Sequence, residues 1–281
     1  MAQEPQNIEI KFGDGRVSKI DKDVHQLIVG FQNKLKNSES NLPFFWNLSS
    51  KILDYDEYLL EFYSFVLKHH QISKSQLFQD LFVYFTHDEK KNGTFLEFGA
   101  TNGVELSNSF MLEQKFGWSG VLAEPSPQWR AELFKNRPKA TILTDCIYSE
   151  TGKKLDFFVS NSGVLSTLDE FKHSDIETMP GNTRMRNASG YNCEVTTISL
   201  NDVISTHFEG EKIDYMSVDT EGSELLILEQ FDFSKFAPKV VTVEHNFTNA
   251  EKKLDDLFFQ NKYQRMFEGY TQFDAWYVLQ E

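Results

Sequence analysis

Cysteine is scarce in this chain, and long apolar runs are missing. The 281 residues include two cysteines, Cys146 and Cys193, whose spacing is not that of a metal site. Two isolated thiols exclude a disulfide framework and favour a reducing compartment. No segment approaches the roughly 20 apolar residues that cross a bilayer, and the first residues show neither a basic start nor an apolar stretch. We therefore expect a cytoplasmic protein.

Positive charge is also in deficit. Lysine and arginine total 28 against 42 aspartates and glutamates, which gives a formal net charge of −14, and no Lys/Arg-rich run occurs. An acidic surface repels phosphate backbones and anionic lipids. Nucleic acid and membrane surfaces are therefore not expected as partners, whereas a small-molecule or saccharide acceptor fits this balance. Self-association into a homo-oligomer stays open.

Residues 1–74 are expected to form a mainly helical N-terminal extension. Residues 7–17 suggest a hairpin that turns at 13–15, and apolar residues recur at helical spacing over 24–35 and 53–69. The remainder, 75–281, is long enough for one α/β domain whose hydrophobic core is stable without disulfide bonds.

From residue 94 onward, apolar strand-like runs alternate with helical patterns, which predicts a parallel sheet with helices on both faces. The expected strands are 94–100, 120–124, 140–146, 213–219 and 240–246. The expected helices are 105–116, 127–136, 223–231 and 248–261, the last opening with a capping box at Thr248 and Glu251. Two further strands, 263–267 and 274–279, are expected to form an antiparallel pair at the end of the parallel sheet. Strands at 155–159 and 193–199 flank a polar insertion, 160–192.

The turn after the first of these strands contains Glu97, Gly99, Asn102 and Gly103. Glycines let the backbone turn tightly and approach a ligand, and the carboxyl ends of parallel strands are the usual ligand sites of open α/β sheets. A dinucleotide fingerprint needs a glycine where this chain has Thr101, so a pyrophosphate cradle is lacking. The pattern favours S-adenosylmethionine over a nicotinamide dinucleotide.

Acids follow the next two strands. One carboxylate at Glu124 can accept both hydroxyls of a ribose, and Asp145, beside Cys146, can accept from an adenine amino group. Either acid could instead be solvated without a ligand. Three consecutive strands that end in ligand-competent groups favour an adenosine site.

The fourth and fifth strands end among further candidate groups. Asp219 and Glu221 could hold a methionine amino group, orient an acceptor or bind a cation, whereas Glu224 could simply stabilise the helix that it begins. Glu244, with Asp219, offers the oxygen ligands that a divalent metal ion prefers. His245 is either a general base, since its ordinary pKa is about 6.5, or a structural histidine. The candidate catalytic residues are Asp219, Glu221 and His245, and we expect replacement of His245 by alanine to lower turnover.

The polar insertion, with Ser166, Thr167, Arg184 and Arg186, is expected to form either a lid over the crevice or a surface loop. Its place between two strands of the domain makes the lid the more informative hypothesis.

Together these residues resemble the FkbM-type family of S-adenosylmethionine-dependent methyltransferases. The matching elements are Ser75–Asp80, Glu97–Gly103, Gly117–Gly120 with Glu124-Pro125, Asp214–Glu224 and Val243–Asn246. The resemblance extends from about Ser75 to the C-terminus, and the combination of motifs is specific although each motif alone is not. His245 departs from the asparagine that is common at this position in the family.

The resemblance implies an α/β protein with the Rossmann-like class I methyltransferase fold, a mostly parallel seven-stranded sheet with an antiparallel C-terminal strand. It implies O-methylation of a sugar or another small metabolite. The cofactor residues that it implies are Glu97, Gly99, Asn102 and Gly103 at the methionine part, Glu124 at the ribose, Asp145 and Cys146 at adenine, and Gln79 and Asp80 closing the pocket. A divalent metal ion stays open. The alternatives are a nicotinamide-dependent oxidoreductase and a non-catalytic adenosine-binding module.

Overall fold

The computed structural model describes residues 7–11, 17–21 and 57–280. The chain divides into two compact units, Met1–Lys68 and His69–Glu281. β1 (Asn7–Lys11) and β2 (Val17–Asp21) pair antiparallel, as the predicted hairpin requires. α3 (Glu57–His69) lies within the helix predicted at 53–69. The hairpin turn at 13–15 and the helix predicted at 24–35 lie outside the described residues.

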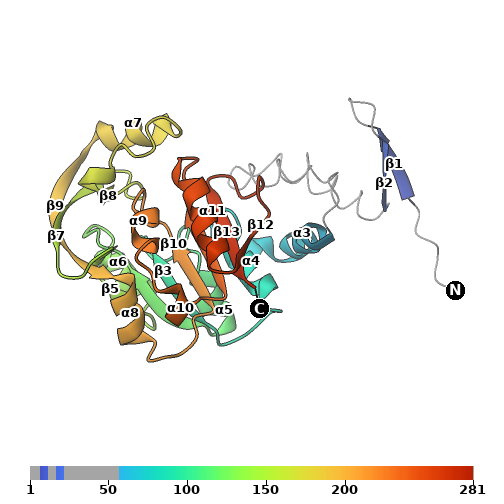
Figure 1. The fold of residues 1–281 in the computed structure, drawn as a ribbon, viewed down its shortest axis with the longest axis horizontal. Helices are drawn as coiled ribbons and strands as arrows, with labels where there is room; N and C mark the ends of the chain where they lie inside the picture. The colour runs from blue at the N-terminus through green and yellow to red at the C-terminus, as the bar shows by residue number, and fades with distance from the viewer. Residues whose placement is uncertain (1–6, 12–16, 22–56, 281) are drawn as a thin grey trace. The chain divides into compact units, whose positions relative to one another are not determined.

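The second unit is built on a seven-stranded sheet in the order β12-β13-β11-β10-β3-β4-β5 (Figure 1). The strands are β3 (Thr94–Phe98), β4 (Ser119–Ala123), β5 (Thr141–Leu143), β10 (Tyr215–Val218), β11 (Val240–Glu244), β12 (Tyr263–Met266) and β13 (Asp274–Leu279). Neighbours from β5 to β11 are parallel, and β13 runs antiparallel to both β11 and β12. This order confirms the predicted Rossmann-like class I fold with its antiparallel C-terminal strand.

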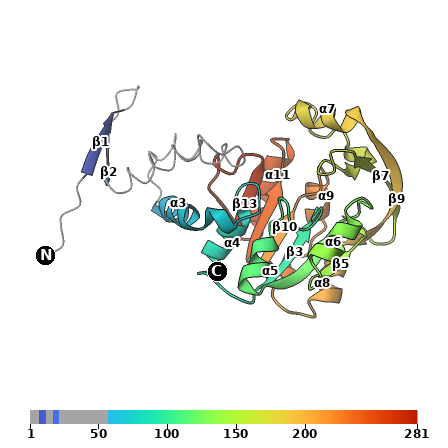
Figure 2. The same ribbon diagram turned by 180° about the vertical axis from the view of Figure 1, so that it is seen from behind.

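Helices connect the strands and cover both faces of the sheet (Figure 2). They are α4 (Gln79–Thr86), α5 (Phe110–Phe116), α6 (Arg130–Asn136), α8 (Leu200–His207), α9 (Glu224–Leu228), α10 (Phe233–Phe236) and α11 (Ala250–Gln260), with a short 3-10 turn, η1 (His70–Ile72), before α4. Successive side chains of a strand point to opposite faces. Trp276 of β13 accordingly stacks on Phe82 of α4, with ring centroids 4.7 Å apart, whereas Tyr277 stacks on Phe258 of α11 at 3.9 Å. In the part of the chain that the structure describes, no helix has the length and apolar character needed to cross a bilayer.

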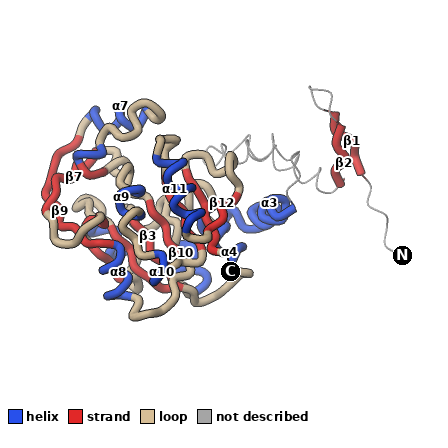
Figure 3. The backbone as a smooth tube through the Cα atoms, in the orientation of Figure 1, coloured by secondary structure: helices blue, strands red, loops and turns tan. Residues whose placement is uncertain are grey.

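A smaller four-stranded sheet follows β5 in the order β6-β9-β7-β8 (Figure 3). Its strands are β6 (Cys146–Tyr148), β7 (Lys154–Ser160), β8 (Thr167–Leu168) and β9 (Gly190–Ser199). β7 and β9 are the two strands that were expected to flank the polar insertion. The insertion between them contains β8, a 3-10 turn, η2 (Asp169–Phe171), and α7 (Pro180–Ala188). Both ribbon views place this sheet and α7 at the opposite end of the unit from β12 and β13.

Three local predictions were wrong. The strand expected at 140–146 is broken, because β5 ends at Leu143 and Cys146 begins a strand of the other sheet. The helix expected from residue 105 begins at Phe110. The backbone N–H of Asn108, just before it, donates to the buried carboxylate of Glu97 and not to a helical carbonyl. The capping box before α11 does not form, since the carboxylate of Glu251 pairs with Arg265 at 2.8 Å instead.

Candidate functional site

The carboxyl ends of β3, β4, β10 and β11 meet at one edge of the main sheet, because these strands are parallel. Gly99 follows β3, Glu124 follows β4, Asp219 follows β10, and Glu244 ends β11. β13 runs the other way, so its first residue, Asp274, lies at this edge in register with Glu244. All five residues line one cavity.

The cavity has a volume of about 180 Å³ and opens to solvent at its mouth. The charged lining residues that the structure describes are all carboxylates: Glu124, Asp219, Glu221, Glu244 and Asp274.

Gly99 is required where the turns after β3 and β10 approach each other. Its φ is +72°, and a Cβ at this position would lie 2.0 Å from the carbonyl oxygen of Asp219. Only glycine fits such a contact at a positive φ. The missing side chain therefore brings Asp219 next to the glycine turn.

Glu124 is the predicted ribose-binding acid, and its carboxylate is held in place at the cavity. One oxygen accepts from the backbone N–H of Thr101 at 2.8 Å and the other from the N–H of Ser126 at 2.8 Å. Burial raises the pKa of Glu124 to about 7, and the two backbone hydrogen bonds oppose that rise. Each oxygen keeps a lone pair for a ligand hydroxyl. The geometry suits recognition of two neighbouring hydroxyl groups.

Glu97 does not line the cavity, although it belongs to the predicted cofactor turn. Its buried carboxylate accepts from the backbone N–H of Asn108 at 2.8 Å and from the hydroxyls of Ser107 and Ser109. Burial raises the pKa of Glu97, and the charge of Arg137 opposes that rise. Glu97 therefore shapes the segment before α5, and any effect on a cofactor is indirect.

Asn102, Gly103 and Asp145 also lie outside the lining. Oδ1 of Asn102 accepts from two backbone N–H groups of its own turn at 3.0 Å each, so this side chain closes the turn. Cys146 does line the cavity, beside Phe157, and burial raises the pKa of its thiol to about 12. This part of the cavity is apolar and suits an adenine ring.

Gln79 and Asp80, at the start of α4, have different roles. Gln79 lines the cavity, and its Nε2 donates to Asp274 at 2.9 Å. Asp80 is fully buried outside the lining and accepts from the hydroxyls of Ser73 and Ser75 at 2.6 Å each. Gln79 therefore belongs to the site, whereas Asp80 organises the chain that leads into α4.

Asp219, Glu221 and Glu244 form a carboxylate cluster on the cavity wall. One oxygen of each lies within 4.8 Å of the others. The side chains of Asp219 and Glu244 lie close enough that one carboxyl, when protonated, can donate a hydrogen bond to the other. Burial, reinforced by neighbouring carboxylates, raises the pKa of both well above the ordinary range. Such a pair can accept a proton, and the three oxygens could also hold a cation.

The turn after β10 is closed by its own hydrogen bonds. Glu221 has a φ of +60°, in the left-handed region that residues with side chains rarely adopt. Oε1 of Glu224 accepts from the N–H groups of Thr220 and Gly222 at 2.8 and 3.0 Å. Thr167 of β8 donates to the carbonyl oxygen of Glu221 at 2.9 Å. Glu224 thus holds the turn and does not line the cavity.

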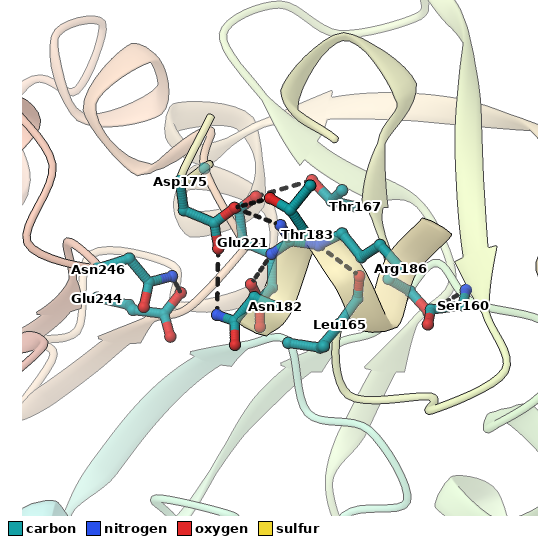
Figure 4. Close-up of polar contacts among 12 residues, drawn as sticks. Ser160, Leu165, Thr167, Asp175, Asn182, Thr183, Arg186, Glu221, Glu244 and Asn246 are labelled. Carbon is teal, nitrogen blue, oxygen red and sulfur yellow. Dashed lines mark hydrogen bonds and ion pairs between the residues drawn. The ribbon is translucent and has the colours of Figure 1, made fainter. Parts of the chain in front are cut away.

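Arg186 of α7 fastens the insertion to this turn (Figure 4). Its fully buried guanidinium donates to Glu221, to Oδ1 of Asp175 at 2.6 Å, and from Nε to the carbonyl oxygen of Leu165 at 3.1 Å. Burial raises the pKa of Glu221 to about 7, and the charge of Arg186 opposes that rise. Asn182 of α7 lines the cavity.

The other predicted lid residues behave differently from one another. Ser166 lines the cavity, Thr167 holds the turn after β10, and Arg184 is exposed. The insertion therefore lies on the cavity as predicted, and its closure over a substrate stays a prediction.

His245 is not brought to the cavity. Its Nδ1 accepts from the N–H of Phe247 at 3.1 Å, and its Nε2 lies 3.6 Å from the carboxylate of Glu251 and 3.5 Å from Nη2 of Arg265. Burial lowers its pKa. Neighbouring residues at the end of β11 point to different sides, so Glu244 faces the cavity while His245 faces α11. We therefore correct the prediction of His245 as a general base: it is a structural histidine.

The lining residues that were not predicted as site residues include Asn108, Asn246 and Asp274. The sequence held a signal for Asp274, since an antiparallel last strand must begin at the edge where the parallel strands end. No comparable signal marks Asn108, which reaches the cavity only because Glu97 draws its backbone inward.

The sheet order is that of a class of protein, the S-adenosylmethionine-dependent methyltransferases with a Rossmann-like fold. A family model described as the methyltransferase FkbM domain matches residues 97–278, and the chain belongs to this family. No curated protein matches the chain.

Similar solved structures include precorrin-6y C5,15-methyltransferase from Geobacter metallireducens GS-15, with a TM-score of 0.39 and 8% identity, covering 75% of this chain and 92% of that chain. A putative sarcosine dimethylglycine methyltransferase from Galdieria sulphuraria has a TM-score of 0.34 and 9% identity, covering 86% and 75%.

Proposed function

We infer that this methyltransferase transfers the methyl group to a hydroxyl oxygen of a sugar or another small hydroxylated metabolite. The observation that carries the inference is the meeting of Gly99, Glu124 and Asp219 on one cavity. The cavity then has a cofactor half, next to Gly99 and Glu124, and beside it a carboxylate half, next to Asp219.

The residues present fit S-adenosylmethionine in the cofactor half. Glu124 presents a fixed carboxylate to the ribose hydroxyls, and Cys146 with Phe157 offers an apolar surface to adenine. Gly99 allows the close approach of the turn that would face the methionine part. When bound, the cofactor supplies an activated methyl group on a sulfonium.

The Asp219–Glu244 pair is the base that we assign to the acceptor. A hydroxyl is a weak nucleophile until its proton begins to leave. The ionised carboxylate of the pair would accept the proton that the hydroxyl loses as its oxygen takes the methyl group from the sulfonium. The raised pKa of both carboxyls makes them better proton acceptors than exposed acids. Glu221, paired with Arg186, sets the electrostatic surroundings of this pair.

Asp219, Glu221 and Glu244 would be the ligands of a divalent ion if one takes part. There it would lower the pKa of the acceptor hydroxyl. Addition of Mg²⁺ or of a chelator to the purified protein, followed by the methyl-transfer assay, tests whether the Asp219–Glu244 pair acts as the base without a metal ion or whether a divalent ion takes part.

The proposal is tested in two stages. Calorimetry should show binding of S-adenosylhomocysteine, weakened about tenfold or more in Glu124→Gln, because a charge-assisted hydrogen bond to the ribose is lost. Glu194→Gln, an exposed acid of β9, is the matched control and should bind normally.

Release of S-adenosylhomocysteine from S-adenosylmethionine with a panel of hydroxylated acceptors is the second stage. Mass spectrometry and NMR of the product locate the new methyl group. Methylation at carbon or nitrogen would contradict the O-methylation proposal, and binding without release by any acceptor would indicate a non-catalytic module.

A further inference from the structure

The cavity offers negative charge and hydrogen-bond acceptors, and little that would bind an anion. Among the lining residues that the structure describes, five are carboxylates and none is lysine, arginine or histidine. The guanidinium of Arg186 lies behind Glu221 and is already paired with Glu221 and Asp175. No side-chain cation is therefore available to a phosphate or carboxylate in the cavity.

The amide side chains of the lining reinforce this polarity. Four of the five turn their N–H groups toward other protein groups, at 2.8 to 3.1 Å. These donations run from Gln79 to Asp274, from Asn108 to Ser217, from Asn182 to Asp175 and from Asn246 to Glu244. One N–H of each of these four amides is therefore engaged within the protein, and two of the four acceptors are carboxylates of the lining, Asp274 and Glu244.

Asn108 carries an acceptor without a partner. The residue is 8% exposed and lines the cavity, and its Oδ1 is buried with no hydrogen bond. Its Nδ2 is held by Ser217 at 2.9 Å, and Ser217 in turn bonds Tyr215, whose hydroxyl bonds Thr242 at 2.8 Å. This chain of bonds fixes the direction of the amide. A buried acceptor left unpaired is unfavourable, so the oxygen indicates a ligand that donates an N–H or O–H.

The cofactor would bring one net positive charge to the cavity, since the sulfonium and ammonium of S-adenosylmethionine outweigh its carboxylate. Five carboxylates line the described part of the cavity, and the guanidinium of Arg186 pairs with only one of them, Glu221. The carboxylates of Asp219, Glu244 and Asp274 form no ion pair among the described residues, so they offer acceptors to a second cationic group beside the cofactor.

The geometry points to an acceptor that carries a protonated amino group near the hydroxyl to be methylated, an amino sugar or a hydroxylated amine, and not a phosphorylated or carboxylated compound. This rests on the proposed function. The ammonium donates to Oδ1 of Asn108 and to the carboxylates. It has no lone pair while it is protonated, so the neighbouring hydroxyl oxygen is the atom that attacks the methyl carbon.

Two trios of compounds that differ in charge on a common framework test the inference. They are 2-amino-1,3-propanediol, glycerol and glycerol 3-phosphate, and glucosamine, N-acetylglucosamine and glucosamine 6-phosphate. Binding to the protein saturated with S-adenosylhomocysteine is measured by calorimetry or ligand-observed NMR. In at least one trio we expect the amine to bind about tenfold more tightly than its neutral partner, with the phosphate weakest. O-methylation of the amine that binds is also expected.

The double variant Asp219→Asn/Glu244→Gln should reduce the preference for the amine about tenfold, because it removes the negative charge of the pair and keeps the shapes of both side chains. Glu194→Gln on the exposed face of β9 should leave the preference unchanged. Equal binding of amine and neutral partners in both trios, or no binding by any amine, overturns the inference. A shift of preference to the phosphates when Mg²⁺ is added overturns it as well, because the carboxylates would then serve a metal ion. Binding of S-adenosylhomocysteine is measured on the same samples, so its failure would count against the proposed function instead.

Discussion

Replacement of Arg186 by methionine tests whether the insertion is fastened to the cavity by charge. The substitution keeps much of the apolar length of the side chain and removes the cation. It leaves Asp175 and Glu221 facing each other across the space that the guanidinium occupies in Figure 4. It also removes the hydrogen bond from Nε to the carbonyl oxygen of Leu165.

The size of the effect follows from burial. The side-chain exposure is 0% for Arg186, 2% for Asp175 and 10% for Glu221, so water compensates little for the lost charge. Removal of one partner from a buried ion pair costs about 3–5 kcal/mol. Because Glu221, with its raised pKa, can take up a proton instead, we expect the lower end, about 3 kcal/mol near neutral pH. For a unit of this size that corresponds to a fall of about 6–12 °C in Tm.

The deficit should depend on pH in a defined direction. The pKa of Glu221 is already raised from 4.5 to about 7, chiefly by burial, and loss of Arg186 raises it further. An acid whose folded pKa exceeds its unfolded value stabilises the fold fully below the unfolded pKa and loses that contribution as pH rises through the folded pKa. The loss of stability relative to the parent protein should therefore be smaller near pH 5 than near pH 8.

Urea unfolding of both proteins at about pH 5 and pH 8 measures this difference. Lys154→Met, which breaks the exposed pair with Glu194, is the control and should have a far smaller effect, because solvent screens that pair. A deficit for Arg186→Met below about 1 kcal/mol at pH 8, or one that does not change with pH, would refute the reasoning.

Three further predictions concern the cavity. The affinity for S-adenosylhomocysteine should rise between about pH 6 and pH 8. The pKa of Glu124 is raised to about 7, and its carboxyl must be ionised to accept hydrogen bonds from both ribose hydroxyls. Calorimetry across this pH range should show the rise in the parent protein and no such trend in Glu124→Gln. Gly99→Ala should lower the free energy of unfolding by about 2 kcal/mol or more in urea melts, because its Cβ would meet a backbone oxygen at 2.0 Å; unchanged stability would exclude that contact. His245→Gln should lower the urea midpoint and leave turnover unchanged, and a large loss of turnover at unchanged stability would restore it as a catalytic candidate.

Part of the site could be predicted because parallel strands obey a simple rule. Once the alternation of strands and helices identified parallel strands, Gly99, Glu124 and Asp219 had to follow their carboxyl ends and so meet at one edge. Adjacent residues were harder to separate. Glu244 and His245 are equivalent candidates in the sequence, and only the direction of each side chain at the end of β11 shows that Glu244 faces the cavity.

The sequence by itself determined the order of elements, the antiparallel finish and the scarcity of positive charge, because these depend on local periodicity and composition. Only the tertiary structure decided that the carboxylates of Asp219, Glu221 and Glu244 lie together, that Glu97 binds the segment before α5, and that Arg186 reaches Glu221 from another part of the chain. Those facts depend on distances of a few ångströms between groups that the chain separates by tens of residues. Burial and pairing, which set the charge of a carboxylate, exist only after the insertion has packed on the sheet edge.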